Sequence, residues 1–251
     1  MDKIRQKLKM YAHHPASFLL ALLVWISAIF TAVTLIFIVG YILIKGVPHL
    51  TPQLFELEYN SENVSMFPAI INTIFMIMLS LLVAGPLGIF AAVYLVEYAK
   101  KGNKLVSVVR VTAETLTGIP SIVYGLFGML FFVTTLRWGY SMLAGAFTLA
   151  IMVLPVIMRT TEEALLAVPD TYREASFGLG AGKLRTIFVV ILPSAVPGIF
   201  SGVILSIGRI VGETAALMYT AGTVAELPDS VMSSTRTLSV HMYSLASEGL
   251  Y

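Results

Sequence analysis

The sequence lacks cysteine and has few charged residues: no cysteine occurs among its 251 residues, and only 12% are Asp, Glu, Lys or Arg. The first absence excludes disulfides, thiolate nucleophiles and cysteine-ligated metal sites. The second separates the chain from soluble globular proteins, in which about 25% of residues are charged. Because 57% of the residues are hydrophobic, we expect an integral membrane protein.

Motifs for catalysis, metal binding and ATP hydrolysis are also missing. The histidines do not have metal-ligand spacing. They are His13, His14, His49 and His241. The segment 180–183 reads Gly-Ala-Gly-Lys but is not a P-loop, because Phe177 and Leu184 stand where Gly and Ser or Thr are required. We therefore predict a protein that is not itself an enzyme, binds no cofactor or metal, and has no nucleic-acid partner.

The apolar residues form five long runs with few charges. A run of about 20 apolar residues is enough to span a bilayer as a helix. The predicted spans are residues 18–44, 69–96, 115–136, 138–158 and 186–219, and the third could begin near Leu105. The sequence therefore predicts an all-α, polytopic membrane protein with five transmembrane helices.

Lys and Arg are distributed unevenly between the loops. Twelve lie in the N-terminal tail and the loops on its side of the membrane, whereas the opposite side has only Lys45, Arg137 and Arg236. Basic residues favour the cytoplasmic side, so we expect a cytoplasmic N-terminus. The expected organisation is a basic tail (1–17), a first helix (18–44), an external loop (45–68), a core (69–219) with a cytoplasmic loop (159–185), and an external loop or tail (220–251).

Gly and Pro interrupt several of the predicted helices at membrane depth. They cluster in residues 85–88, 118–121 and 193–198, and Pro155 stands alone. Proline removes a backbone hydrogen bond, and broken helices are common in transporters. We predict structural breaks at Pro120 and Pro193. Tight packing is the alternative, since both residue types are frequent in membrane helices.

Arg209 and Glu213 are the only charged residues between Thr186 and Ala225. At spacing i, i+4 they would share one helix face and could pair. Intramembrane charges usually face a protein interior or an aqueous path, and Arg is suited to oxyanions. The residues alone leave open whether they contact a substrate or lock helices together. Nearer the cytoplasm, Arg110 and Glu114 have the same spacing and are expected to form a local ion pair.

The cytoplasmic segment 167–193 carries the most specific pattern. Thr171 and Glu174 fit a capping box that would start a short helix, and Gly180 and its neighbouring glycines would end it. Such an amphipathic helix suits a groove on a soluble partner, or it could rest on lipid.

This segment resembles the EAA loop of ABC importer permeases. The resemblance rests on Glu174 and Ala175, Gly180, and the Leu-Pro pair at 192–193, all at the spacing of the family pattern. Ser176 and Val190 are conservative departures. The resemblance implies that Arg173, Glu174, Ala175 and Gly180 couple the permease to ATPase subunits.

Three further motifs are similar to those of phosphate-specific importer permeases, and more to the A-type subunit than to its C-type partner. They are residues 118–125, 159–163 and 208–214, and the resemblance covers roughly residues 65–250. It implies a type I ABC importer permease fold in a bacterial or archaeal cytoplasmic membrane. It also implies partners: a second permease, two cytoplasmic ATPase subunits that use ATP, and an external phosphate-binding protein. Arg209 and Glu213 would then lie on the phosphate pathway.

Members of that family usually have a sixth span, which the prediction for this chain lacks. We therefore expect the C-terminus outside, and a truncated chain is one interpretation. The alternatives are a permease for another oxyanion or small solute, and a non-transporting membrane protein.

Overall fold

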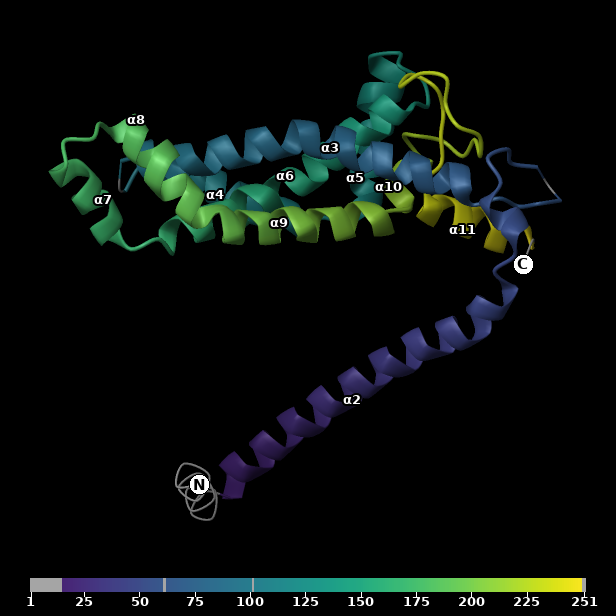
Figure 1. The fold of residues 1–251 in the computed structure, drawn as a ribbon, viewed down its shortest axis with the longest axis horizontal. Coiled ribbons are helices and arrows are strands. Elements are labelled where there is room, and N and C mark those ends of the chain that lie inside the picture. The colour runs from purple at the N-terminus through teal and green to yellow at the C-terminus, as the bar shows by residue number, and fades with distance from the viewer. Residues whose placement is uncertain (1–14, 61, 101, 250–251) are drawn as a thin grey trace. The chain divides into compact units, whose positions relative to one another are not determined.

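The computed structural model describes residues 15–60, 62–100 and 102–249, and every regular element within them is a helix (Figure 1). This confirms the all-α prediction. The chain divides into two compact units, 1–52 and 53–251. In the first, α2 (Pro15–Gly46) leads into a 3₁₀ turn, η1 (Val47–His49). Apolar side chains are exposed all around α2, as expected of a helix that lipid or other subunits cover.

Three long helices form the centre of the second unit. They are α3 (Phe67–Val93), α6 (Met142–Leu166) and α9 (Leu192–Gly212). Helix α6 packs against both others, and Figure 1 shows it between them. Its buried face belongs to two apolar clusters, which include Met76, Leu149, Met152, Ile157, Ile210 and Leu217 and Leu165, Ile187 and Ile191.

Shorter elements complete the unit. They are η2 (Pro52–Phe55), the π-helical η3 (Tyr94–Tyr98), α4 (Lys104–Thr117), α5 (Ser121–Gly128), the π-helical η4 (Met129–Thr135), α7 (Asp170–Gly178), α8 (Lys183–Arg185), the π-helical η5 (Thr186–Ile191), α10 (Ala215–Met218) and α11 (Leu238–Glu248). Each π-helical segment continues a helix or is continued by one, so α3 with η3, and η5 with α9, form long helices.

Among the described residues, four helices are long and apolar enough to cross a membrane, and a bent pair makes a fifth candidate. The four are Ala16–His49, Phe67–Tyr98, Met142–Leu166 and Lys183–Gly212. The pair consists of α4 and of the helix that α5 and η4 form together, and the chain bends by 102° between them. The predicted span 115–136 therefore contains a sharp bend near its start, and the predicted span 186–219 ends at Gly212.

Only one of the predicted proline interruptions is a break. Pro120 precedes α5 at the bend. In contrast, Pro86, Pro155 and Pro197 lie inside continuous helices. The prediction of a break at Pro193 was wrong, because Pro193 lies in the first turn of α9 and the helix continues from η5 through it. A π-helical turn just before a proline relaxes the backbone hydrogen bonding that the ring disrupts.

Small residues let the long helices approach closely. A Cβ added at Gly88 of α3 would lie 2.9 Å from Ile157 Cγ2 of α6, and one at Gly202 of α9 would collide with Thr160 of α6. Helix packing in membranes relies on such contacts because lipid gives little hydrophobic driving force for association.

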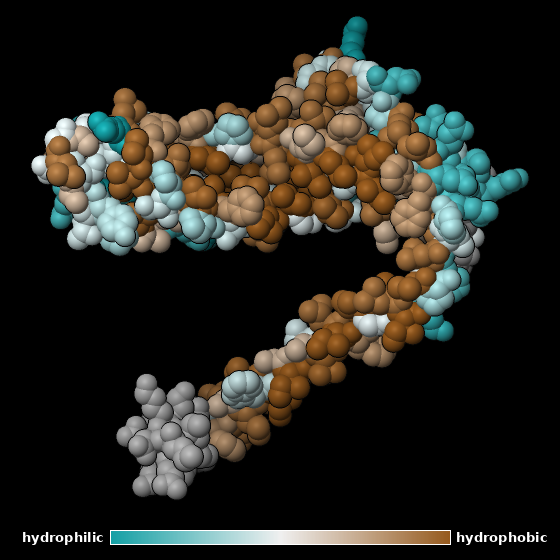
Figure 2. Space-filling model, in the orientation of Figure 1, coloured by the Kyte–Doolittle hydropathy of each residue, from teal (hydrophilic) through white to brown (hydrophobic). Residues whose placement is uncertain are grey.

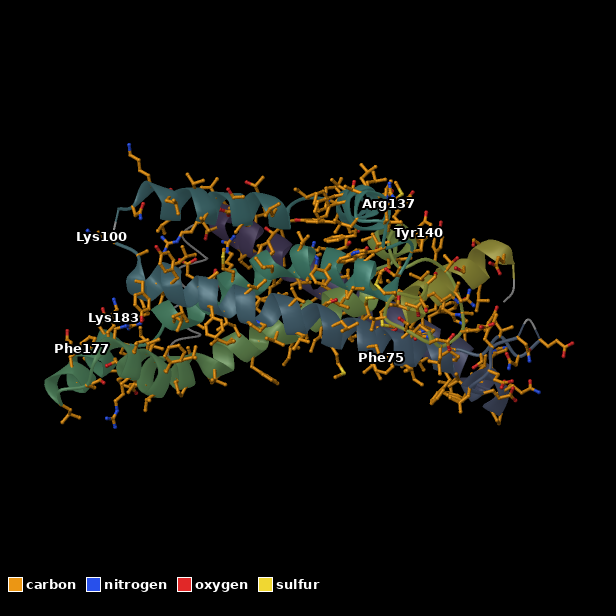
Figure 3. All side chains as sticks on the ribbon, turned by 90° about the horizontal axis from the view of Figure 1, so that it is seen from above. Phe75, Lys100, Arg137, Tyr140, Phe177 and Lys183 are labelled. Carbon is orange, nitrogen blue, oxygen red and sulfur yellow. The ribbon has the colours of Figure 1, made fainter. Side chains whose placement is uncertain are left out.

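The surface of the second unit is divided along its length. Figure 2 shows hydrophobic side chains over its middle and hydrophilic ones toward its ends. Lys100, Phe177 and Lys183 lie at one end, whereas Arg137 and Tyr140 lie in the other half (Figure 3). Lys183 Nζ is 4.6 Å from the ring centroid of Tyr98, so α8 contacts η3, the segment that continues α3.

Candidate functional site

Two helix interruptions meet in the second unit. One is the bend between α4 and α5 at residues 118–120, and the other follows α9 at residues 213–214. A Cβ at Gly125 of α5 would lie 2.7 Å from Cα of Ala216 in α10, so the two backbones touch. The hydroxyl of Tyr124 donates a hydrogen bond of 2.7 Å to the carbonyl oxygen of Leu116 in the last turn of α4. Interrupted helices at membrane depth are where transporters build their binding sites.

Arg209 lies in the last turn of α9 beside this junction. It is partly exposed, and its charge acts electrostatically on the hydroxyl of Tyr124. Among the described residues it makes no ion pair. Its guanidinium is therefore available to an oxyanion, which it can contact through two parallel N–H groups.

Glu213 is buried and serves the backbone rather than Arg209. Helix α9 ends at Gly212, so Glu213 is extended rather than helical, with φ −75° and ψ 126°. Its Oε1 accepts a hydrogen bond of 3.1 Å from the backbone N–H of Ala216, in the first turn of α10. The expectation that Arg209 and Glu213 share a helix face was wrong, because the helix ends between them.

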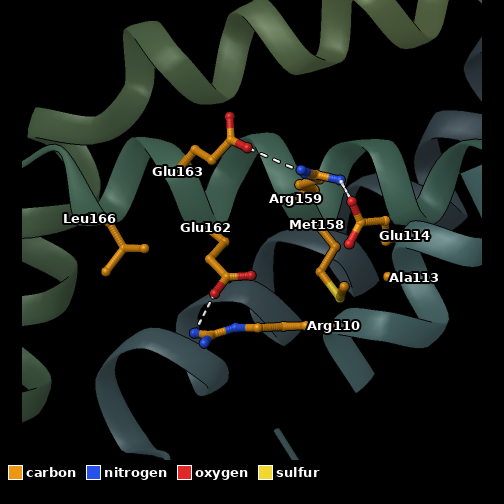
Figure 4. A pocket seen from close by; sticks show the side chains of 8 residues that line it. All are labelled: Arg110, Ala113, Glu114, Met158, Arg159, Glu162, Glu163 and Leu166. Carbon is orange, nitrogen blue, oxygen red and sulfur yellow. Dashed lines mark hydrogen bonds and ion pairs between the residues drawn. The ribbon is translucent and has the colours of Figure 1, made fainter. Parts of the chain in front are cut away.

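Four charged side chains join α4 to α6 (Figure 4). Arg110 pairs with Glu162 at 2.5 Å, and Arg159 pairs with Glu114 at 3.4 Å. Arg159 also contacts Glu163 at 3.3 Å. These residues line a cavity of about 300 Å³. The predicted local pair of Arg110 with Glu114 was wrong, since each pairs with α6 instead. Sequence spacing gives neighbours on one helix but does not reveal partners on another.

The loop helix α7 exposes most of the residues that the EAA resemblance singled out. Glu174 and Ala175 are exposed, and Leu179 is 90% exposed. A groove of about 510 Å³ lies between Tyr172 and Leu179 of this loop and Val189 of η5. An apolar groove at the end of a membrane protein is suited to docking a soluble partner.

The ends of α7 differ in part from the prediction. The helix begins at Asp170 after Pro169, without a side-chain cap, so the predicted capping box of Thr171 and Glu174 was wrong. Proline pre-sets the backbone that a cap would otherwise fix. Past the helix, Gly180 has φ +81°, the left-handed conformation that favours glycine.

Arg173 faces inward and ties α7 to the rest of the core. Its Nη2 lies 2.7 Å from Oε1 of Glu97 in η3, and its Nε lies 3.1 Å from the same oxygen. It also donates to the carbonyl oxygens of Leu165 and Val168, at 3.1 and 3.0 Å. Only 15% of the Arg173 side chain and 10% of the Glu97 side chain are exposed. Arg173 therefore holds the loop helix in place, whereas its neighbours Glu174 and Ala175 remain exposed. Nothing in the sequence pattern marked Glu97.

Removing Arg173 should free the loop helix. We expect Arg173→Ala to cost about 3–5 kcal/mol, because it leaves the buried carboxylate of Glu97 without a partner. Asp170, which also pairs with Arg173 but is 86% exposed, is the matched control, and Asp170→Ala should cost less than about 1 kcal/mol. Hydrogen exchange of residues 170–178 in the purified complex measures both. Equal protection of these amides from exchange in the two variants would contradict the claim that the Arg173–Glu97 ion pair holds α7 in place.

These features define a class of protein. Apolar spanning helices, a broken pair and an exposed loop helix with the EAA spacing form the architecture of an ABC importer permease. The model of the family described as binding-protein-dependent transport system inner membrane component matches residues 84–246. The chain belongs to this family, and it is a multi-pass inner membrane protein and the transport subunit of an ABC transporter complex.

Relatives support this placement. The chain is 34% identical over 240 residues to the probable ABC transporter permease protein YqgI of Bacillus subtilis, covering 90% of this chain and 81% of that protein. It is 40% identical over 205 residues to the phosphate transport system permease protein PstA of Pasteurella multocida, covering 81% and 72%. It is 34% identical over 221 residues to PstA of Haemophilus influenzae, covering 87% and 78%.

A solved structure supports the fold. A chain of the MetNI methionine ABC transporter in an inward-facing conformation superposes with a TM-score of 0.54 at 20% identity, covering 74% of this chain and 80% of that one. At this identity the likeness concerns the fold alone.

Proposed function

We propose that this chain is the A-type permease of an ATP-driven importer of inorganic phosphate and forms half of the translocation pathway. The observation that carries the proposal is Arg209, whose guanidinium lies at the junction of two helix interruptions and has no ion-pair partner in the part of the chain that the structure describes. A doubly charged oxyanion matches a site with fixed N–H donors and one positive charge. The relatives named as phosphate transport system permeases support the same cargo.

The partners follow from the same proposal. A second, similar permease completes the pathway, two cytoplasmic ATPase subunits hydrolyse ATP, and an external protein delivers phosphate. The exposed face of α7, with Glu174, Ala175 and the turn at Gly180, docks on an ATPase subunit. This chain binds no nucleotide or other cofactor itself. A pathway for anions must bind them weakly enough to release them, and a single arginine without an ion-pair partner among the described residues is a site of that kind.

Orientation is part of the proposal. With the N-terminus in the cytoplasm, the α7 end faces the ATPases and the α11 end faces outward, in accord with the excess of Lys and Arg at the α7 end. A reporter fused after Arg185 should give a cytoplasmic signal, and one fused after Asp229 an external signal. A cytoplasmic signal at Asp229 would reverse the orientation and overturn this part of the account.

The cargo is tested by uptake of radiolabelled phosphate in cells that depend on the complete transporter. Unlabelled phosphate should compete, whereas sulfate in large excess should not. Equal competition by sulfate would mean a less selective oxyanion permease.

A further inference from the structure

Arg236 is a buried cation that has no counter-ion among the described residues. It is 4% exposed and lies just before α11, at the end of the second unit away from α7 (Figure 1). Its Nε and Nη2 atoms are buried and have no hydrogen-bond partner. No carboxylate in the described part of the chain pairs with it. Glu56, an acidic residue of the nearby loop, instead accepts a hydrogen bond of 2.9 Å from Asn63.

The groups around Arg236 are unpartnered hydrogen-bonding groups. The hydroxyls of Thr235 and Thr237 and both ring nitrogens of His241 are buried without a partner. Tyr59 contacts both Arg236 and His241. Its ring centroid lies 4.7 Å from Cζ of Arg236 and 5.8 Å from the ring centroid of His241. Native proteins leave few buried polar groups unsatisfied. Several of them around one cation indicate that a ligand supplies the missing partners.

The unpartnered edge of the Arg236 guanidinium has the geometry for an oxyanion. Nε and Nη2 form one edge of the guanidinium, and this edge makes paired contacts with the oxygens of phosphate or carboxylate. Thr237 occupies the N-cap of α11, but its side chain makes no capping hydrogen bond. The N-terminus of the eleven-residue α11 therefore adds a favourable dipole and a free hydroxyl beside the cation.

His241 is neutral in this setting. Burial, and next the positive charge of Arg236, lower its pKa from 6.5 to about 4, and the backbone of Val64 opposes this shift only in part. A neutral imidazole can donate one hydrogen bond to an anion without adding a second buried charge.

We propose that Arg236, His241, Thr235 and Thr237 form a second oxyanion site at the external end of the permease, closed in this structure. The site receives phosphate before the anion reaches Arg209. The identity of the anion rests on the proposed function, whereas the site itself rests on the unpartnered groups. Because these groups are buried, a local opening of the segment before α11 must admit the anion, and the bound anion then stabilises the closed form.

The test is hydrogen exchange of residues 235–244 in the purified transporter complex, in potassium gluconate with and without inorganic phosphate. Phosphate at about ten times its Kd should slow exchange about tenfold. Arg236→Gln should abolish this effect. It should also slow exchange in phosphate-free buffer, because it removes an uncompensated buried charge. Arg236→Lys, which keeps the charge but not the paired edge, should show a reduced effect.

Arg137 provides the matched control, since it is an exposed arginine in the same half of the core. Arg137→Gln should leave the phosphate effect intact, and so should Arg209→Gln. A phosphate effect that survives Arg236→Gln, or no effect of any oxyanion on the native chain, overturns the proposed site. If sulfate slows exchange through Arg236 but phosphate does not, the site stands and the phosphate cargo of the proposed function fails. Loss of protection by Arg236→Gln in phosphate-free buffer would make Arg236 a structural residue and overturn the site.

Discussion

Replacing Arg209 with glutamine should lower phosphate uptake roughly 10- to 150-fold, the loss expected when a hydrogen bond to a charged group is removed. The complex should still assemble, because Arg209 makes no ion pair in the described structure and its removal leaves no buried charge alone. Initial uptake rates in cells, normalised to the amount of complex in the membrane, give the result.

Glu213 supplies the comparison variants. Glu213→Gln keeps a side-chain oxygen that can accept from the N–H of Ala216, so it should assemble, whereas Glu213→Ala removes this contact and should destabilise the turn into α10. The double variant Arg209→Gln, Glu213→Gln should remain assembled and fail to transport. If the two residues merely locked helices together, removing both would restore function. Near-normal uptake by the double variant would therefore falsify a pathway role for Arg209.

Replacing Gly180 with valine should abolish ATP-driven transport while the protein still inserts into the membrane. Gly180 has φ +81° and no atom within 4 Å of an added Cβ, so the cause is backbone strain and not a collision within this chain. Holding a β-branched residue in this conformation costs about 1–3 kcal/mol, and the turn after α7 would rearrange. The measurement is uptake together with co-purification of the ATPase subunits.

Gly182 offers a control two residues further on. It has φ −72° and ψ 161° and no atom within 4 Å of an added Cβ, so Gly182→Val should be tolerated. Glu174→Lys reverses a charge on the exposed face of α7 and should also reduce docking. Normal transport by Gly180→Val or Glu174→Lys would show that this loop does not couple the chain to the ATPases.

The sequence predicted the helices well because apolar runs of this length have few alternatives in a membrane. It failed where tertiary contacts decide the outcome. Prolines such as Pro86 and Pro155 are accommodated inside continuous helices, α3 and α6, that pack against each other. After α9 ends at Gly212, Glu213 accepts a hydrogen bond from the backbone N–H of Ala216 in α10, and periodicity contains no signal for such a turn.

In the candidate sites, too, the sequence predicted local features and missed contacts between distant parts of the chain. The local pattern of segment 167–193 predicted the short helix α7 and the glycine turn after it, although its capping box was wrong, because a left-handed glycine and a short helix are local features. It could not show that Arg173 turns inward, since Glu97 is 76 residues away in the chain. Arg236 likewise stood out in the sequence only as an external charge. Its missing counter-ion is visible only once the chain is folded.

The most direct test of the account is transport by the purified complex in proteoliposomes, with ATP on the side of the ATPase subunits and the phosphate-binding protein on the other. The account predicts that radiolabelled phosphate accumulates on the ATP side only when ATP is hydrolysed. It also predicts that Arg209→Gln lowers the rate of accumulation roughly 10- to 150-fold without loss of the complex. Accumulation that is unaffected by Arg209→Gln, or a complex that hydrolyses ATP but moves no phosphate, would contradict it.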